Sequence, residues 1–140
     1  MDDWKRLTTV GNRCFERGEL AAARAAYQEA LISAERWLLC GEVADDAVAA
    51  FVVTHQNLAE VYAALDDGER AFDHLRIALD RLLRVLAACE DRPELQAAAL
   101  RHYYRARMAM LEFVRSHGLS MTLEERRRSR RGLMSLVSLH

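Results

Sequence analysis

The sequence has little of what a β-rich protein needs at its turns, because it holds one proline and six glycines in 140 residues. These two residue types supply the dihedral angles of tight turns, so a chain poor in both is expected to be helical. It also lacks any apolar run approaching about 18 residues, which excludes a membrane-spanning helix. The start, Met-Asp-Asp-Trp-Lys-Arg, is acidic where a secretory signal is basic, and no apolar stretch follows it. We therefore expect no export signal and a cytoplasmic protein.

Sequence signatures of catalysis and metal binding are also missing. Cys14, Cys40 and Cys89 are odd in number and lack C-x-x-C spacing, which favours buried free thiols in a reducing cytosol. The five histidines are scattered, and neither an H-E-x-x-H motif nor a glycine-rich phosphate loop occurs. The acidic pairs Asp45-Asp46 and Asp66-Asp67 fall at helix boundaries, where carboxylates stabilise the N-terminus of the following helix. The sequence therefore predicts no catalytic site, no metal and no cofactor.

The formal net charge of −1 gives no overall bias towards nucleic acid or acidic membranes. Five arginines are nevertheless concentrated near the end of the chain, and such a cluster is able to contact phosphates. No aromatic residue interleaves the cluster, and helix-turn-helix chemistry is absent. We interpret it as a solvated helix face and expect no nucleic-acid partner. The cluster consists of Arg126, Arg127, Arg128, Arg130 and Arg131.

What the chain does contain is the 3.6-residue apolar period of amphipathic helices. Asp2 or Asp3 is placed to cap a first helix, which Gly18 ends. Thr122-Leu123-Glu124-Glu125 is a capping box for the last of six helices. The four between are predicted from Glu19 to about Leu39, from about Asp45 to Leu65, from Glu69 to about Cys89, and from Asp91-Arg92-Pro93-Glu94 to His117-Gly118.

Two stretches of the sequence, Gly11 to Leu31 and Leu58 to Leu79, read almost alike. The pair Ala30-Leu31 recurs as Ala78-Leu79, and the offset between the two pairs is the repeat period of this chain. A unit that recurs and cannot close its own core must stack on its neighbours. Small residues at fixed places are expected to let two antiparallel helices approach closely, and larger ones to fill the gaps beside them. The small residues are Ala23, Ala30, Ala71 and Ala78, and the larger ones are Phe15, Tyr27, Tyr62 and Leu75.

This pattern resembles the tetratricopeptide repeat (TPR) family. The resemblance implies an all-α fold, a right-handed superhelix of antiparallel helical hairpins with about six helices in a single domain over residues 1–140. Repeat 1 would span about residues 4–40, repeat 2 about 45–89, and an irregular third hairpin with a closing helix about 92–139. The family period is about 34 residues, so a spacing of 48 implies unusually long second helices. The motif residues of the first unit are Leu7, Gly11, Phe15, Gly18, Ala23, Tyr27, Ala30 and Leu31, and those of the second include Asn57, Leu58, Ala59 and Tyr62.

In the resembled family, the first helix of each repeat lines a concave groove that holds a partner segment. Some members clamp a C-terminal carboxylate with Lys, Asn and Arg side chains, and Thr8 stands here where the first Lys is expected. Ion pairs with neighbours such as Glu60 are the alternative role for Arg101 and Arg105. Asn57 is our expected best single contact. Mapped by position, the groove would present Lys5, Thr8, Asn12, Phe15 and Glu16 from the first unit, Gln56, Asn57, Glu60 and Ala64 from the second, and Arg101, Tyr104, Arg105, Met108 and Glu112 from the third.

The resemblance implies a non-catalytic protein-protein interaction module, a scaffold that binds a partner peptide or helix in its groove. A secretion-system-type chaperone, which covers an aggregation-prone subunit, is the alternative. A homo-oligomeric structural protein is a second alternative, in which the last helix contacts another copy through Leu133, Leu136 and Val137. The sequence leaves open the partner and whether it offers a C-terminal carboxylate, an extended peptide or a helix.

Overall fold

The computed structural model describes residues 2–40, 44–88 and 91–117. The regular structure in these ranges is entirely α-helical, which confirms the all-α fold, and the five helices lie within a few residues of their predicted positions. The sixth predicted helix lies outside the described residues. The helices are α1 (Asp2–Glu16), α2 (Leu20–Cys40), α3 (Ala44–Ala64), α4 (Gly68–Ala88) and α5 (Pro93–His117).

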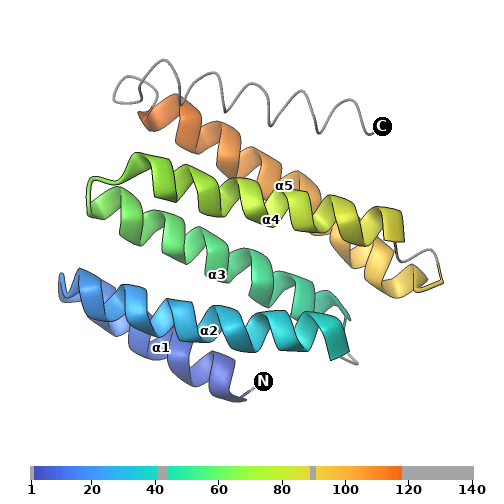
Figure 1. The fold of residues 1–140 in the computed structure, drawn as a ribbon, viewed down its shortest axis with the longest axis horizontal. Helices are drawn as coiled ribbons and strands as arrows, with labels where there is room; N and C mark the ends of the chain where they lie inside the picture. The colour runs from blue at the N-terminus through green and yellow to red at the C-terminus, as the bar shows by residue number, and fades with distance from the viewer. Residues whose placement is uncertain (1, 41–43, 89–90, 118–140) are drawn as a thin grey trace.

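The helices pack in neighbouring pairs along the chain, and α5 also packs against α3. Figure 1 shows α1, α3 and α5 running in one direction and α2 and α4 in the other, with α1 and α5 lying behind α2 and α4. Consecutive helices are therefore antiparallel. The C-terminal ends of α1, α3 and α5 point to the same side of the molecule, and this shared direction matters for the charge of the candidate site.

The turns that close the two hairpins are built alike. After α1, the Gly18 amide donates to the Phe15 carbonyl and the Glu19 amide to the Cys14 carbonyl. These two bonds form a Schellman motif, which requires a left-handed residue, and Gly18 has a φ of 77°. After α3, the Asp66 amide donates to the Ala63 carbonyl and the Asp67 amide to the Tyr62 carbonyl. Asp66, with a φ of 60°, takes the left-handed place one repeat period after Gly18.

Small side chains at the hairpin contacts are almost completely buried. Ala23, Ala30 and Ala71 have no exposed surface, and Ala78 is 1% exposed. Tyr27 and Leu75 are also buried, as the repeat pattern predicts. Position 11 of α1 tolerates no residue larger than glycine, because a Cβ atom on residue 11 would lie 2.7 Å from Cδ1 of Tyr27. Close helix packing in the first hairpin therefore depends on this glycine.

A hydrogen-bond chain joins α1 to α3. The Trp4 indole N–H donates to the Thr54 hydroxyl at 2.8 Å, and that hydroxyl donates to the Ala50 carbonyl at 2.6 Å. Thr54 is completely buried, so the two bonds satisfy a hydroxyl group that water does not reach. This link fixes the beginning of α1 beside the middle of α3.

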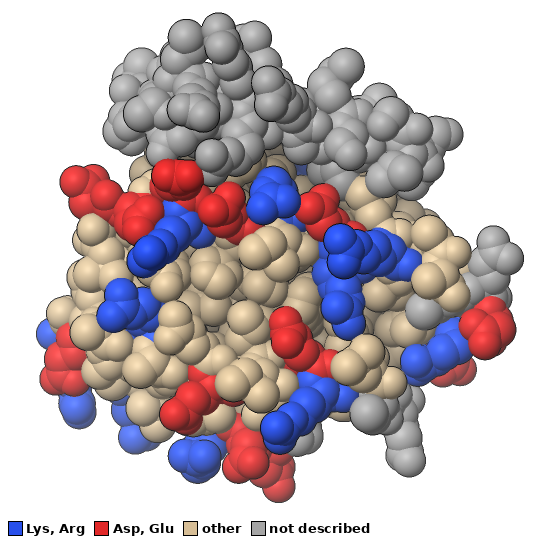
Figure 2. All heavy atoms as spheres, in the orientation of Figure 1, with Lys and Arg blue, Asp and Glu red and all other residues tan. Residues whose placement is uncertain are grey.

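The surface over α2, α3 and α4 carries charged side chains of both signs among uncharged ones (Figure 2). Over the described part of that face, no broad field of one sign is visible. Cys14 is a free, half-buried thiol, and the side chains of Cys40 and Cys89 lie outside the described set. None of the five described helices is long and apolar enough to cross a bilayer.

Candidate functional site

A cavity of about 310 Å³ lies between α3 and α5 and opens to solvent. Leu75 of α4 contributes to its lining from beneath, and it is 6% exposed. The lining is mostly apolar, and its size lies at the low end of the range of about 300–1,000 Å³ for binding pockets. The lining residues of α3 are Gln56, Ala59, Glu60 and Ala63, and those of α5 are Ala109, Glu112, Phe113, Ser116 and His117.

Short side chains leave this space open. Ala59 and Ala63 on α3 and Ala109 on α5 present only methyl groups where the two helices face each other. Leu75 occupies the place that Tyr27 holds one repeat period earlier, and Ala59 corresponds in the same way to Gly11. In the first hairpin, the Tyr27 ring covers Gly11. Beside the second hairpin, Leu75 is shorter than tyrosine, and the three alanines of α3 and α5 present only methyl groups. Together they leave room for a further side chain.

Two carboxylates stand at the cavity. Glu112 accepts hydrogen bonds from Arg115 at 2.6 and 2.7 Å, and these bonds lower the pKa of the Glu112 carboxyl. Glu60 is exposed and forms no hydrogen bond or ion pair within the described residues. The described lining contains no Lys or Arg. The cavity therefore has an apolar interior with an unpaired carboxylate at its edge.

The hydroxyl of Tyr27 extends the polar surface towards α1. It donates to Oδ1 of Asn12 at 2.6 Å. Burial raises the pKa of the Tyr27 hydroxyl, and the nearby Glu60, Cys14 and Glu16 raise it further. Asn12 is thus occupied by a partner within its own hairpin.

An ion pair lies towards the opposite ends of α3 and α5. Asp45 accepts a hydrogen bond from Arg101 at 2.7 Å, and Nε2 of His102 lies 3.3 Å from the same oxygen. The bond from Arg101 is the main cause of the lowered pKa of the Asp45 carboxyl. Arg101 therefore forms a cross-helix pair, the alternative weighed from the sequence, with Asp45 as its partner in place of Glu60. Its charge is already balanced without a ligand.

The structure brings part of the predicted groove together. The predicted residues Gln56, Glu60 and Glu112 line the cavity, while Asn57, half-buried beside Gln56, does not. Phe15 packs against the core, and Tyr104 and Arg105 are exposed outside the cavity. A shift of one repeat period from Gln56 predicts Tyr104 as its counterpart on α5. In the structure, the α5 residues that face Gln56 and Glu60 lie nearer the C-terminal end of that helix, at Ala109 and Glu112. The predicted oligomer contacts Leu133, Leu136 and Val137 lie outside the described residues.

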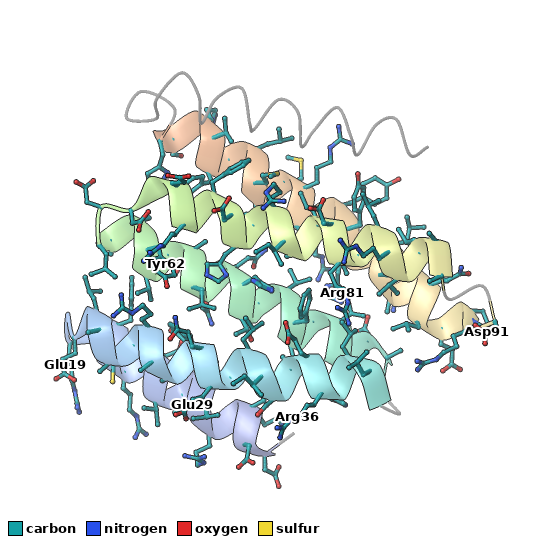
Figure 3. The ribbon with its side chains drawn as sticks, viewed as in Figure 1. Glu19, Glu29, Arg36, Tyr62, Arg81 and Asp91 are labelled. Carbon is teal, nitrogen blue, oxygen red and sulfur yellow. The ribbon has the colours of Figure 1, made fainter. Side chains whose placement is uncertain are left out.

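A buried histidine pair is the strongest titratable feature away from the cavity. Nδ1 of His55 on α3 lies 3.1 Å from Nδ1 of His74 on α4. Burial lowers the pKa of His55 to about 3, with a smaller contribution from His74, and burial also lowers the pKa of His74. The ring of His74 stacks on Tyr62, which lies near the C-terminal end of α3 (Figure 3). His55 is 2% exposed, so a substrate cannot reach it, and we assign this pair to the core.

The described side chains also lack a metal-type cluster. No group of three or more His, Cys, Asp or Glu side chains converges there in a way that would hold a metal ion. The cavity between α3 and α5 is consequently the site to which the geometry points.

Fold and cavity together define an all-α stack of helical hairpins with a small apolar pocket between two parallel helices. The chain belongs to the DUF2753 family of proteins of unknown function, whose family model matches residues 2–132. No curated protein and no solved structure matches the chain.

Proposed function

We propose that this protein is a non-catalytic interaction module of TPR type that binds a segment of a partner polypeptide in the cavity between α3 and α5. The observation that carries the proposal is the cavity itself, a preformed apolar pocket of about 310 Å³ between α3 and α5. The resemblance of the repeats to the TPR family supports it, because that family binds partners on the same helices.

The physical basis is preorganisation. The walls stand on α3 and α5, which are 21 and 25 residues long and pack against each other and against α4. A partner segment then loses conformational entropy on binding, but the receptor has little left to lose. An apolar side chain entering the cavity gains roughly 25 cal/mol for each Å² that it removes from water. Pockets of this kind give an interface its most strongly contributing contacts.

Filling the cavity tests this proposal. We expect Ala63→Leu and Ala109→Leu to weaken partner binding by at least about tenfold, because each new side chain would occupy the space that the partner needs. Leucine is a strong helix former, so the helices themselves should persist. Ala97→Leu, at an exposed position of α5 outside the cavity, is the matched control. The partner is obtained by affinity purification from the native organism, and its affinity for each variant is measured by calorimetry.

Unchanged affinity in both cavity variants, with helicity and unfolding midpoint retained, would disprove the proposal. Co-purification in a stoichiometric complex distinguishes a chaperone from an adaptor, because an adaptor should be mostly free.

A second candidate function, homo-oligomer formation, is favoured by an exposed apolar stripe on α5. Its members recur at helical spacing, and Met108 is 65% exposed and Tyr104 58%. Exposed apolar patches mark interaction surfaces in many proteins. We expect Met108→Glu to lower the molar mass measured by light scattering if copies associate through this stripe, whereas Arg107→Glu should leave it unchanged. The stripe consists of Leu100, Tyr104, Met108 and Leu111.

A further inference from the structure

We infer that the segment bound in the cavity is cationic: an apolar side chain enters between α3 and α5, and a neighbouring Lys or Arg pairs with Glu60. This inference rests on the proposed function and specifies the chemistry of the partner. It differs from the carboxylate-terminated segment that the TPR resemblance left open.

The first argument is the charge inventory at the cavity. Its described lining contains two carboxylates and no Lys or Arg. Arg115 already pairs with Glu112, so that carboxylate is largely balanced. Glu60 forms no ion pair within the described part of the chain, although it stands at the edge of an apolar pocket. An incoming ammonium or guanidinium group would supply the missing partner.

The second argument is the direction of the helices. α1, α3 and α5 run the same way, so their C-terminal ends lie on one side of the molecule (Figure 1). Each helix carries a partial negative charge at that end, equivalent to roughly half an elementary charge. Glu16, Glu60 and Glu112 all lie in the last two turns of these helices. The N-terminal ends of α2 and α4 lie on the same side and offset part of this charge, because these two helices run the other way. Glu60 and Glu112 stand at the cavity itself, whose described lining holds no Lys or Arg, so the local charge favours cations over carboxylates.

The third argument is the state of the predicted carboxylate clamp. Arg101 is paired with Asp45, and Asn12 accepts a hydrogen bond from Tyr27. Arg105 is exposed but does not line the cavity. Within the described lining, a partner carboxylate in the cavity would thus meet Glu60 and Glu112 and no Lys or Arg. The arrangement of charges favours the opposite ligand.

Synthetic peptides test this inference on the full-length chain. We would use three fluorescent dodecapeptides that share a central Leu-Phe pair: one flanked by lysines, one flanked by glutamates, and one that ends in Leu-Phe with a free carboxylate. Binding is measured by fluorescence anisotropy at low and at physiological salt. We expect the lysine peptide to bind about tenfold tighter than the other two at low salt, with a smaller preference at higher salt because ions screen exposed charges.

Variants then assign the preference to Glu60. Since an exposed ion pair contributes about 0.2–1 kcal/mol, Glu60→Gln should weaken lysine-peptide binding by about 1.4- to fivefold. Glu60→Lys should weaken it further and improve binding of the glutamate peptide. Glu29→Lys makes the same charge change on α2 (Figure 3), which does not line the cavity, and should leave both affinities unchanged.

Two outcomes would overturn the inference. One is equal or tighter binding of the acidic or carboxylate-terminated peptide, and the other is no binding of the lysine peptide at millimolar concentration. If Ala109→Leu still blocks the natural partner in either case, the proposed function stands and only the cationic chemistry is wrong. If Ala109→Leu has no effect on that partner, the proposed function itself fails.

Discussion

Gly11→Ala is expected to destabilise the protein by about 1–3 kcal/mol, the usual cost of overpacking a tight contact. The result is informative because local helix propensity predicts the opposite sign. Alanine is about 1 kcal/mol more favourable than glycine inside a helix. Here the added Cβ would lie 2.7 Å from Cδ1 and 2.9 Å from Cζ of Tyr27. Tyr27 cannot move away easily, because it is 3% exposed and its hydroxyl is bonded to Asn12.

The second hairpin suggests the compensating change. The residues one repeat period after Gly11 and Tyr27 are Ala59 and Leu75, so that unit combines alanine with a smaller partner. In a Tyr27→Leu background, Gly11→Ala should therefore be neutral or stabilising. Unfolding by urea, followed by circular dichroism, gives the free energies for this double-mutant cycle.

Gly68→Ala is the control for the glycine prediction, since a Cβ atom at Gly68 meets no atom within 4 Å. It should change stability by less than about 1 kcal/mol. If Gly11→Ala changes the free energy of unfolding by the same amount with Tyr27 and in the Tyr27→Leu background, the contact between residues 11 and 27 is not the cause of the destabilisation.

Acid should unfold this protein through its buried histidine pair. With Nδ1 atoms 3.1 Å apart, one ring donates and the other accepts, and burial favours the neutral form of both rings by lowering the pKa of each. The edge of Phe51 lies against His55, and Tyr62 stacks on His74. Burial lowers the pKa of His74, and the Asp73 carboxylate raises it in part. For His55, burial and His74 both lower the pKa, and no carboxylate opposes them. Protonation of either Nδ1 acceptor would place two N–H groups face to face in an apolar setting.

The sign of the pH effect follows from the direction of these shifts. The pKa of His55 is lowered to about 3 in the folded protein from 6.5, the ordinary value of an exposed histidine, so the unfolded chain binds the proton more readily. The stability from the neutral pair is complete above about pH 6.5 and is lost as the pH falls towards 3. His55 alone should lower the free energy of unfolding by about 1.4 kcal/mol for each pH unit in that window. Urea midpoints at several pH values between 7.5 and 4 provide the measurement.

Replacing the titrating ring tests the assignment to this pair. His55→Leu should flatten the pH dependence between 6.5 and 4, even if the variant is less stable at neutral pH. His102→Gln, which removes a histidine beside Asp45 and away from the pair, is the control for the loss of a histidine elsewhere in the fold. If His55→Leu keeps the full slope, the acid sensitivity originates elsewhere.

Local features of the fold were accessible from the sequence. Amphipathic periodicity located α1 to α5, because each helix must turn an apolar face to its neighbours. Gly18 marked the end of α1, since glycine adopts the left-handed conformation that a Schellman turn requires. The buried alanines Ala23 and Ala71 followed from the same repeat, because close helix packing needs small side chains there.

The candidate site was only partly accessible. Gln56 and Glu60 were predicted because they lie on the face of α3 that the repeat register turns inwards. On α5, Glu112 was predicted, but Arg101, Tyr104 and Arg105 were assigned too early in the helix. A sequence shift relates equivalent positions and does not tell which residues of two helices lie opposite each other. Ala109 was missed for this reason.

The sequence by itself determined that this chain forms antiparallel helical hairpins and where each helix begins and ends, because these properties depend on residues close together in the chain. Tertiary structure alone decided the cavity beside Leu75, the pairing of Arg101 with Asp45 and the meeting of His55 with His74. Each of these depends on how far one helix slides along another. Side-chain packing over the whole length of the helices sets that offset, and no local pattern encodes it.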